Sequence, residues 1–263
     1  MQEFLKEEDN KAHTEDSLLN GKVIVRQPEK GYRFSIDSVL LAAAVSVDNG
    51  ENILDVGAGV GVAGLCLAYR FEHLRVVGIE CQRNLVRLAT DNILLNSFRD
   101  RVEILYGDLQ NPPPRLAAGS YSQVISNPPY FDISQGRASP YYSKAISNHT
   151  GSSTMEIWIK FCLLMLKPLG KITFIYRADM LDYLLSLFYG KVGQINVLPL
   201  WSSKDQPAKR VIIQGIKGMK GGLNLLKGIS MHNQDGSFSD EANAILRDGQ
   251  PISFCNGGLH GVY

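Results

Sequence analysis

The sequence has few cysteines, almost no net charge and no long apolar run. Only four of its 263 residues are cysteine, and their spacing forms neither a Cys-x-x-Cys pair nor another pattern typical of a metal site. We therefore expect reduced thiols, no metal and a cytoplasmic location. Because no apolar run reaches the length of a membrane span and no basic-then-apolar signal pattern opens the chain, we also expect no membrane association.

The net charge of +1 excludes a strong field over the whole protein that would attract nucleic acid or membranes. The charges are nevertheless unevenly distributed. Residues 1–20 contain six acids against two lysines, which predicts an acidic, flexible tail. Residues 204–227 contain six bases against one acid, and they form either a solvated loop or a functional basic face.

Short apolar strands alternate with amphipathic helices from residue 51 onward. We expect strands at 52–57, 74–80, 101–108, 122–126, 171–177, 194–200 and 210–216, with helices at 61–71, 81–96, 155–170 and 178–190. This alternation predicts an α/β fold with a mostly parallel seven-stranded sheet and helices on both faces.

A small strand/helix extension, residues 21–46, is expected before this alternation. It consists of two short strands within 21–35 around a proline turn, followed by a helix over 37–45 with Asp37 as its N-cap. The predicted organisation is therefore a single domain over 21–250, with the acidic tail before it and a C-terminal tail, 251–263, after it.

A glycine-rich turn, "DVGAGVGVAG", follows the first strand of the alternation. Its Gly57 and Gly59 allow the backbone to approach a ligand closely, and Glu80 ends the next strand 23 positions after Gly57. These features fit NAD and S-adenosylmethionine equally well. Asp55 favours S-adenosylmethionine, because a carboxylate there repels a pyrophosphate and attracts an ammonium and a sulfonium. Asp108, at the end of the third strand, is expected to accept a hydrogen bond from the adenine amino group of the cofactor.

The segment "VISNPPYFD" ends the fourth strand with two prolines between an amide and an aromatic pair. The prolines form a rigid corner that cannot continue a strand. The side-chain oxygen of Asn127 and the carbonyl of Pro128, held in place by Pro129, can accept both hydrogens of an exocyclic amine and so activate its nitrogen. Tyr130 offers a face on which an extruded base can stack, and Phe131 lines the same pocket. The corner therefore predicts methylation of a planar amine or amide.

These motifs resemble the class I S-adenosylmethionine-dependent methyltransferases that carry an Asn-Pro-Pro-Tyr signature. Members of that group act on adenine N6 in DNA or RNA, or on a protein glutamine amide. Together with "GYRFSIDSVLLAAAV", "RAD" and "LRDG", the motifs are similar to one branch, the bacterial tRNA (adenine-37 N6)-methyltransferases that modify valine tRNA beside the anticodon. The resemblance covers about residues 20–250 and implies a Rossmann-like class I methyltransferase domain.

The resemblance also implies roles for individual residues. It assigns the catalytic target-base pocket to Asn127, Pro128, Pro129 and Tyr130. It assigns cofactor binding to Asp55, Gly57, Gly59 and Glu80, and it places Arg33 and Asp37 in an N-terminal element that closes over the cofactor side. The loop after the corner departs from the family, because only Lys144 and Ala145 suggest the basic segment usual there.

The implied substrate is tRNA, methylated on adenine N6. Lys209 and Arg210 precede the strand "VIIQGI" and are expected to bind RNA phosphates if they lie on the side of the active site. Two alternatives remain at this point: a methyltransferase acting on another RNA, on DNA or on a protein glutamine amide, and a non-catalytic cofactor- or RNA-binding partner protein. A monomer and a homodimer are both compatible with the sequence.

Overall fold

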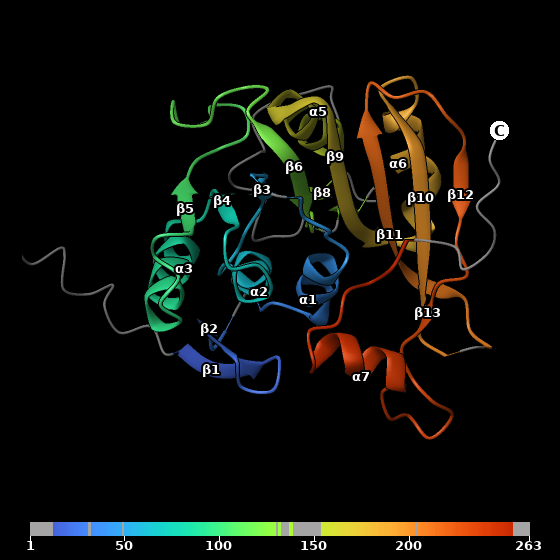
Figure 1. Cartoon of the computed structure of the whole chain (residues 1–263), viewed down its shortest axis with the longest axis horizontal. Helices are drawn as coiled ribbons and strands as arrows, with labels where there is room; N and C mark the ends of the chain where they lie inside the picture. Colours follow the sequence, from blue (N-terminus) through green and yellow to red (C-terminus); the bar gives the residue numbers. More distant parts are fainter. Residues whose placement is uncertain are drawn as a thin grey trace, which may run out of the picture.

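One mostly parallel sheet of nine strands organises the part of the chain that the structure describes (Figure 1). The structure is a computed structural model that describes residues 13–30, 33–48, 50–129, 131–132, 137–138, 154–203 and 205–254. The strand order is β12 (Leu223–Leu225), β10 (Val192–Trp201), β11 (Ala208–Lys217), β9 (Leu166–Arg177), β6 (Tyr121–Ser126), β3 (Asn52–Val56), β4 (Arg75–Glu80) and β5 (Val102–Tyr106), and β13 (Ile229–Ser230) pairs with β10. Only β11 runs antiparallel to its neighbours in this sheet. The predicted Rossmann-like fold is confirmed, and β12 and β13 are short additions to the seven expected strands.

Helices cover both faces of this sheet, as predicted (Figure 1). The buried apolar residues of α1, α2 and α3 belong to one core cluster, and those of α5 and α6 belong to a second cluster on the opposite face. The helices are α1 (Ile36–Ala43), α2 (Val62–Arg70), α3 (Arg83–Leu95), α5 (Thr154–Met165), α6 (Leu181–Phe188) and α7 (Asp240–Leu246), and a 3-10 turn, η2 (Ala178–Met180), precedes α6.

An antiparallel hairpin, β1 (His13–Leu18) with β2 (Val23–Pro28), precedes the main sheet. The prediction is wrong here in two respects, because β1 lies inside the expected acidic tail and the strand expected after the proline turn is not a partner of β2. The side chains of Asn92 on α3 and of Asn96, the residue that caps its C-terminal end, accept hydrogen bonds from the backbone of β2 at 2.7 and 2.9 Å. The hairpin is thereby fixed to α3. Residues 1–12 lie outside the described residues.

Most predicted boundaries shift by a few residues, and three differences concern how elements begin or end. Ser35, not Asp37, caps α1, because its side chain accepts a hydrogen bond from the Asp37 amide. Helix α5 ends at Met165, and the residues up to Gly170 already belong to β9, so the proline and glycine in this segment do not end the helix. Ile252, inside the predicted C-terminal tail, is buried and its amide donates to the Ala43 carbonyl at 2.8 Å. A short additional pair, β7 (Phe131–Asp132) with β8 (Arg137–Ala138), follows the Asn-Pro-Pro corner.

Candidate functional site

The glycine-rich turn after β3 is held tightly against neighbouring elements. The amides of Gly57 and Ala58 both donate to the carbonyl of Ile79, at 2.9 and 3.1 Å, which fixes the turn to the end of β4. Gly57 has a φ of +78°, and a Cβ atom there would lie 2.7 Å from the ring of Trp158. Only glycine therefore satisfies both the backbone conformation and the space at this position.

Two buried carboxylates lie beside this turn. Glu80 is 1% exposed, and its two oxygens accept hydrogen bonds from the amides of Gly59, at 3.0 Å, and Gln82, at 2.9 Å. Asp55 is 3% exposed, and burial raises its pKa to about 7, with the charge of Glu80 adding to the rise. Removing two carboxylates from water is costly unless a positive charge accompanies them. The site therefore suits a cationic ligand better than a pyrophosphate.

Gln82 was missed by the sequence reasoning. It is the N-cap residue of α3, and its Nε2 atom is shielded from solvent without a hydrogen-bond partner among the described residues. Buried donors without partners are rare in proteins and call for an explanation such as a ligand. A glutamine amide next to Glu80 supplies a donor for a nucleoside, so the residues present fit the adenosine part of S-adenosylmethionine. A glutamine at this place carries no signal of its own in a single sequence.

The Asn-Pro-Pro corner lies directly beside the glycine-rich turn. The pairing of β3 with β6 ends at Val56 and Ser126, so Gly57 and Asn127 are the first residues beyond two neighbouring strand ends. Asn127 is partly exposed and Pro128 is buried. Tyr130 and Lys144 lie outside the described residues, as does the side chain of Phe131. The structure thus brings the predicted cofactor turn and the predicted amine-binding groups together at one edge of the sheet.

Three buried polar side chains around the corner were also missed. Ser126 donates to the Val56 carbonyl at 2.7 Å and accepts a hydrogen bond from Trp158 Nε1 at 2.8 Å. At the C-terminal end of the corner, the Tyr176 hydroxyl donates to the Pro129 carbonyl at 3.4 Å. Trp158 lies on α5 and Tyr176 on β9, so neither is close to the corner in the sequence.

Asp37 and Arg210, which were predicted to bind cofactor and substrate respectively, form an ion pair. Arg210 Nε lies 3.1 Å from Asp37 Oδ2, and Asp37 is only 6% exposed. The pair joins the first turn of α1 to the start of β11. Arg33 instead contacts the hairpin, where it donates to Thr14 Oγ1 at 2.9 Å and lies 3.5 Å from Asp16 Oδ2.

Asp108 lies at the same sheet edge as Glu80. The amide of Gly107 donates to the Glu80 carbonyl at 3.0 Å, which places the following residue, Asp108, next to the end of β4. Asp108 Oδ1 accepts a hydrogen bond from the Gln110 amide at 2.9 Å. This turn fixes the orientation of the Asp108 carboxylate; its contact with the adenine of a cofactor stays a prediction.

The basic residues of segment 204–227 are divided between two edges of the sheet. Because β11 is antiparallel to β9, its first residues lie at the edge where β6 and β9 end, and its last residues lie at the opposite edge. Lys209 is exposed at the first edge, the same edge as the candidate site, on a strand that β9 separates from β6. Lys217 and Lys220 lie toward the other edge, where Lys217 Nζ donates to the Leu166 carbonyl at 2.7 Å. The segment is therefore not a single basic face.

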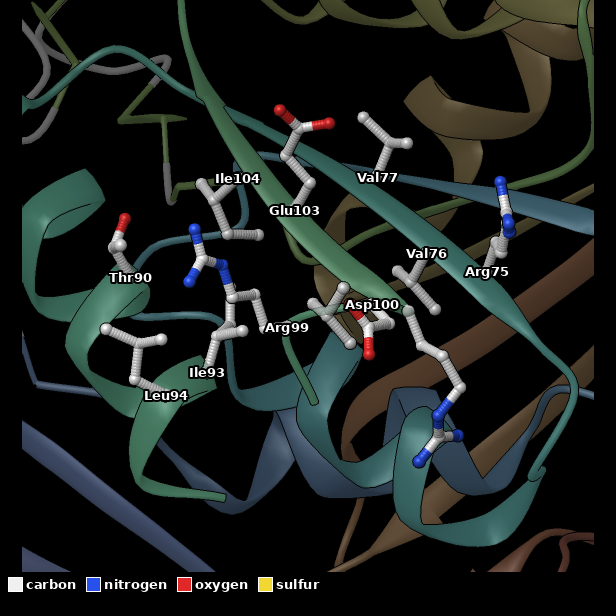
Figure 2. Close-up of a pocket in the computed structure, with 12 residues that line it drawn as sticks. Arg75, Val76, Val77, Thr90, Ile93, Leu94, Arg99, Asp100, Glu103 and Ile104 are labelled. Carbon is white, nitrogen blue, oxygen red and sulfur yellow. The ribbon is translucent and has the colours of Figure 1, made fainter. Parts of the chain in front are cut away.

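A cavity of about 630 Å³ lies elsewhere, between α3 and the starts of β4 and β5 (Figure 2). Arg75, Arg99, Asp100 and Glu103 contribute charged side chains to it (Figure 2). The glycine-rich turn, Glu80 and Asp108 are at the other end of these strands, so this cavity is separate from the candidate site.

Within the described residues, no group of three or more histidine, cysteine or acidic side chains is placed to hold a metal ion. None of the described helices has the length and apolar character needed to cross a membrane.

The known proteins to which this chain is similar in sequence are methyltransferases. Residues 32–141 match the family model "Methyltransferase small domain". The tRNA1(Val) (adenine(37)-N6)-methyltransferase of Pedobacter heparinus is 31% identical over 185 residues, covering 69% of this chain and 76% of the relative. The enzyme of the same name from Aeromonas hydrophila is 27% identical over 208 residues, covering 78% of this chain and 84% of the relative.

Solved structures of more distant proteins share the fold. A predicted O-methyltransferase, protein Atu636 from Agrobacterium tumefaciens, superposes with a TM-score of 0.69 at 22% identity, covering 82% of this chain and 98% of that chain. P. horikoshii TYW2 in complex with MeSAdo has a TM-score of 0.55 at 16% identity, covering 80% of this chain and 73% of that chain. At such identities the likeness concerns the fold alone.

Proposed function

The chain belongs to the family of the tRNA1(Val) (adenine(37)-N6)-methyltransferases, and we propose that it methylates the exocyclic N6 of an adenine in tRNA, adenine 37 beside the anticodon. S-adenosylmethionine is its cofactor. The observation that carries the proposal is the position of Asn127, one residue beyond the last pair between β6 and β3, next to the start of the glycine-rich turn at Gly57. The groups proposed to bind the target amine therefore lie next to the turn proposed to bind the methyl donor.

The chemistry requires little from the protein besides placement. S-adenosylmethionine supplies a methyl group bound to a sulfonium sulfur. When the methyl group is transferred, the sulfur is left as a neutral thioether and needs no acid to assist it. Asn127 Oδ1 and the Pro128 carbonyl accept hydrogen bonds from the two N6–H groups, which localises the nitrogen lone pair toward the methyl group and stabilises the positive charge that develops there. As the N–CH3 bond forms and the S–CH3 bond breaks, the nitrogen becomes cationic, and it then releases one proton to solvent to give the neutral methylated amine. Because Pro128 and Pro129 fix the backbone, this arrangement is set before the base arrives.

The proposed cofactor-binding roles begin with the two buried carboxylates, Asp55 and Glu80. Asp55 favours the positive charges of the cofactor, and Glu80 supports the turn through Gly59 while it remains available to ribose hydroxyls. Gln82 and Asp108 provide a donor and an acceptor for the adenosine part. These roles are proposals that rest on burial and position.

The test is a methyl-transfer assay on unmodified bulk tRNA with labelled S-adenosylmethionine and nucleoside analysis of the product. The wild-type protein should form N6-methyladenosine, and Asn127→Ala should lose this activity while it keeps cofactor binding. Asn111→Ala is a control, because Asn111 also precedes a run of prolines, three in its case, but lies exposed in the loop after β5. Cofactor binding without any tRNA product would reject the substrate, and ribosomal RNA, DNA and protein glutamine amides would then be assayed. Absence of transfer to every acceptor would favour a non-catalytic binding protein.

The tRNA contact is expected at Lys209. This lysine is exposed at the sheet edge of the site, whereas Arg210 beside it is paired with Asp37. We expect Lys209→Ala to weaken tRNA binding for all sequences alike and to lower the salt-dependence slope by about one. Arg210→Ala should weaken tRNA binding too, and because it breaks a largely buried ion pair it should also lower the melting temperature.

The matched control for this contact is Lys220→Ala. Lys220 is exposed in the turn after β11, toward the opposite edge of the sheet. Filter binding across a range of salt concentrations measures both the affinity and the slope. Equal effects of Lys209→Ala and Lys220→Ala would contradict a directed contact, and unchanged affinity in both would exclude this edge from RNA binding.

A further inference from the structure

A buried hydrogen-bonded connection joins the glycine-rich turn to the Asn-Pro-Pro corner. Ser126, fully buried, is the residue before Asn127, and its hydroxyl donates at 2.7 Å to the carbonyl of Val56, the residue before Gly57. The same hydroxyl accepts a hydrogen bond from Trp158 Nε1 at 2.8 Å. One side chain therefore contacts both strands at the last pair of the ladder, where backbone pairing between β3 and β6 stops.

The ring of Trp158 contacts the glycine-rich turn, the other half of the site. It is 2% exposed and packs so closely on Gly57 that a Cβ atom there would approach two ring atoms to 2.7 and 2.8 Å. The indole nitrogen thus fixes the residue before the corner while the indole ring limits the position of the turn. A shift of α5 would move both groups together.

Tyr176 contacts the C-terminal end of the corner. This residue is 1% exposed on β9, and its hydroxyl donates to the Pro129 carbonyl at 3.4 Å. Asn127 and Pro128, which supply the two proposed acceptors, lie between the residues held by Trp158 and by Tyr176. Catalysis by preorganised acceptors depends on placement within about 0.5 Å, and such placement requires supporting side chains whose own rotamers are locked.

We propose that Ser126, Trp158 and Tyr176 are positioning residues that hold the amine acceptors in register with the cofactor turn. The proposal rests on the proposed function, because it assigns these residues to the acceptors Asn127 and Pro128. None of the three needs to touch either substrate. Their contribution is the fixed distance between the two halves of the site.

The variants that test this remove one polar atom each. Trp158→Phe keeps an aromatic ring beside Gly57 and removes Nε1, Ser126→Ala removes the hydroxyl, and Tyr176→Phe removes only the phenolic oxygen. We expect kcat for tRNA methylation to fall about 10- to 100-fold in each, as misplacement by about 1 Å does. The dissociation constant for S-adenosylmethionine should change by less than about threefold, because the cofactor groups remain. Ser126→Thr, which retains a hydroxyl, should recover most of the loss.

Matched controls separate positioning from general stability. Trp201 is the only other tryptophan, and its Nε1 donates to the Lys227 carbonyl at 3.1 Å, so Trp201→Phe removes an equivalent bond away from the corner. Tyr121→Phe removes a hydroxyl from a buried tyrosine at the opposite end of β6. Melting temperatures identify any variant that loses activity by unfolding. Unchanged kcat in the folded positioning variants, or equal losses in the controls, would overturn the proposal.

A second measurement needs no substrate. Hydrogen exchange in peptides that span residues 121–132 should be faster in Ser126→Ala and Trp158→Phe than in Trp201→Phe, because the corner loses its support. Equal exchange in all three would overturn the proposal even if tRNA is methylated. Inactivity of the wild-type protein together with faster exchange in the variants would reject the tRNA substrate and retain the positioning role.

Discussion

Replacing Asp55 with asparagine should strengthen the fold and weaken cofactor binding at the same time. Asp55 is 3% exposed and lies beside the negative charge of Glu80, and its pKa is raised to about 7 from its ordinary value of 3.8. A carboxyl group whose pKa is raised by folding favours the folded state at low pH. That stabilisation is lost as the pH rises through the folded pKa.

The size of the effect follows from the two pKa values. With 3.8 in the unfolded chain and about 7 in the folded protein, the ionisation of Asp55 lowers the free energy of unfolding by about 2–3 kcal/mol more at pH 8 than at pH 5. Asparagine does not ionise, so the free energy of unfolding of the variant does not decrease in this way as the pH rises. For a chain of this size the difference corresponds to roughly 5–10 °C in melting temperature.

Thermal unfolding of the cofactor-free protein between about pH 5 and pH 8 measures this difference. The gap in melting temperature between Asp55→Asn and wild type should widen in favour of the variant as the pH increases. Asp91→Asn is the control, because Asp91 is exposed on α3. Calorimetric titration should show at least about tenfold weaker binding of S-adenosylmethionine to Asp55→Asn, since the charge that favours the cofactor is gone. A pH-independent gap would refute the electrostatic reasoning, and unchanged affinity would refute the cofactor role.

Two further predictions concern the same turn. In the wild-type protein, affinity for S-adenosylmethionine should fall by up to about tenfold per pH unit below pH 7, because binding must then remove the proton from Asp55; calorimetric titration over this range checks it, and a constant affinity would contradict it. Gly57→Ala should lower the free energy of unfolding by about 2–5 kcal/mol, through strain at positive φ and overlap with the tryptophan ring. Gly119→Ala, with a φ of +66° and no neighbour within 4 Å of the added Cβ, should cost only about 1–2 kcal/mol in chemical denaturation, and equal losses would argue against the overlap.

The sequence was sufficient for the sheet because its strands are short, apolar and separated by helices with a clear period. It failed where local and tertiary preferences disagree. Strand β1 is polar, with alternating exposed and partly buried residues, and it forms because β2, itself fixed to α3, offers a partner that no local pattern reveals. The segment after Met165 contains a proline and a glycine and was expected to end a helix. It forms the first part of β9 instead, because it pairs with β6.

The candidate site shows the same division. Asp55, Gly57, Glu80 and Asn127 could be predicted together because each lies at or next to the end of a strand, and strand ends of a parallel sheet share an edge. The supporting residues were missed because their contacts join distant parts of the chain; Trp158 reaches Ser126 across 32 residues. For the same reason, Asp37 and Arg210 were assigned separately although they form a pair.

The place of β11 in the sheet has a consequence for how the protein is made. β11 lies between β9 and β10 although it is synthesised after both, so β10 has no link to the rest of the sheet until residues 208–217 have left the ribosome. The same strand carries Lys209 and brings Arg210 to Asp37. In vectorial synthesis the glycine-rich turn is therefore complete first, the Asn-Pro-Pro corner second and the edge that carries Lys209 last. A nascent chain interrupted before residue 208 carries both halves of the catalytic centre but lacks the strand that completes this edge.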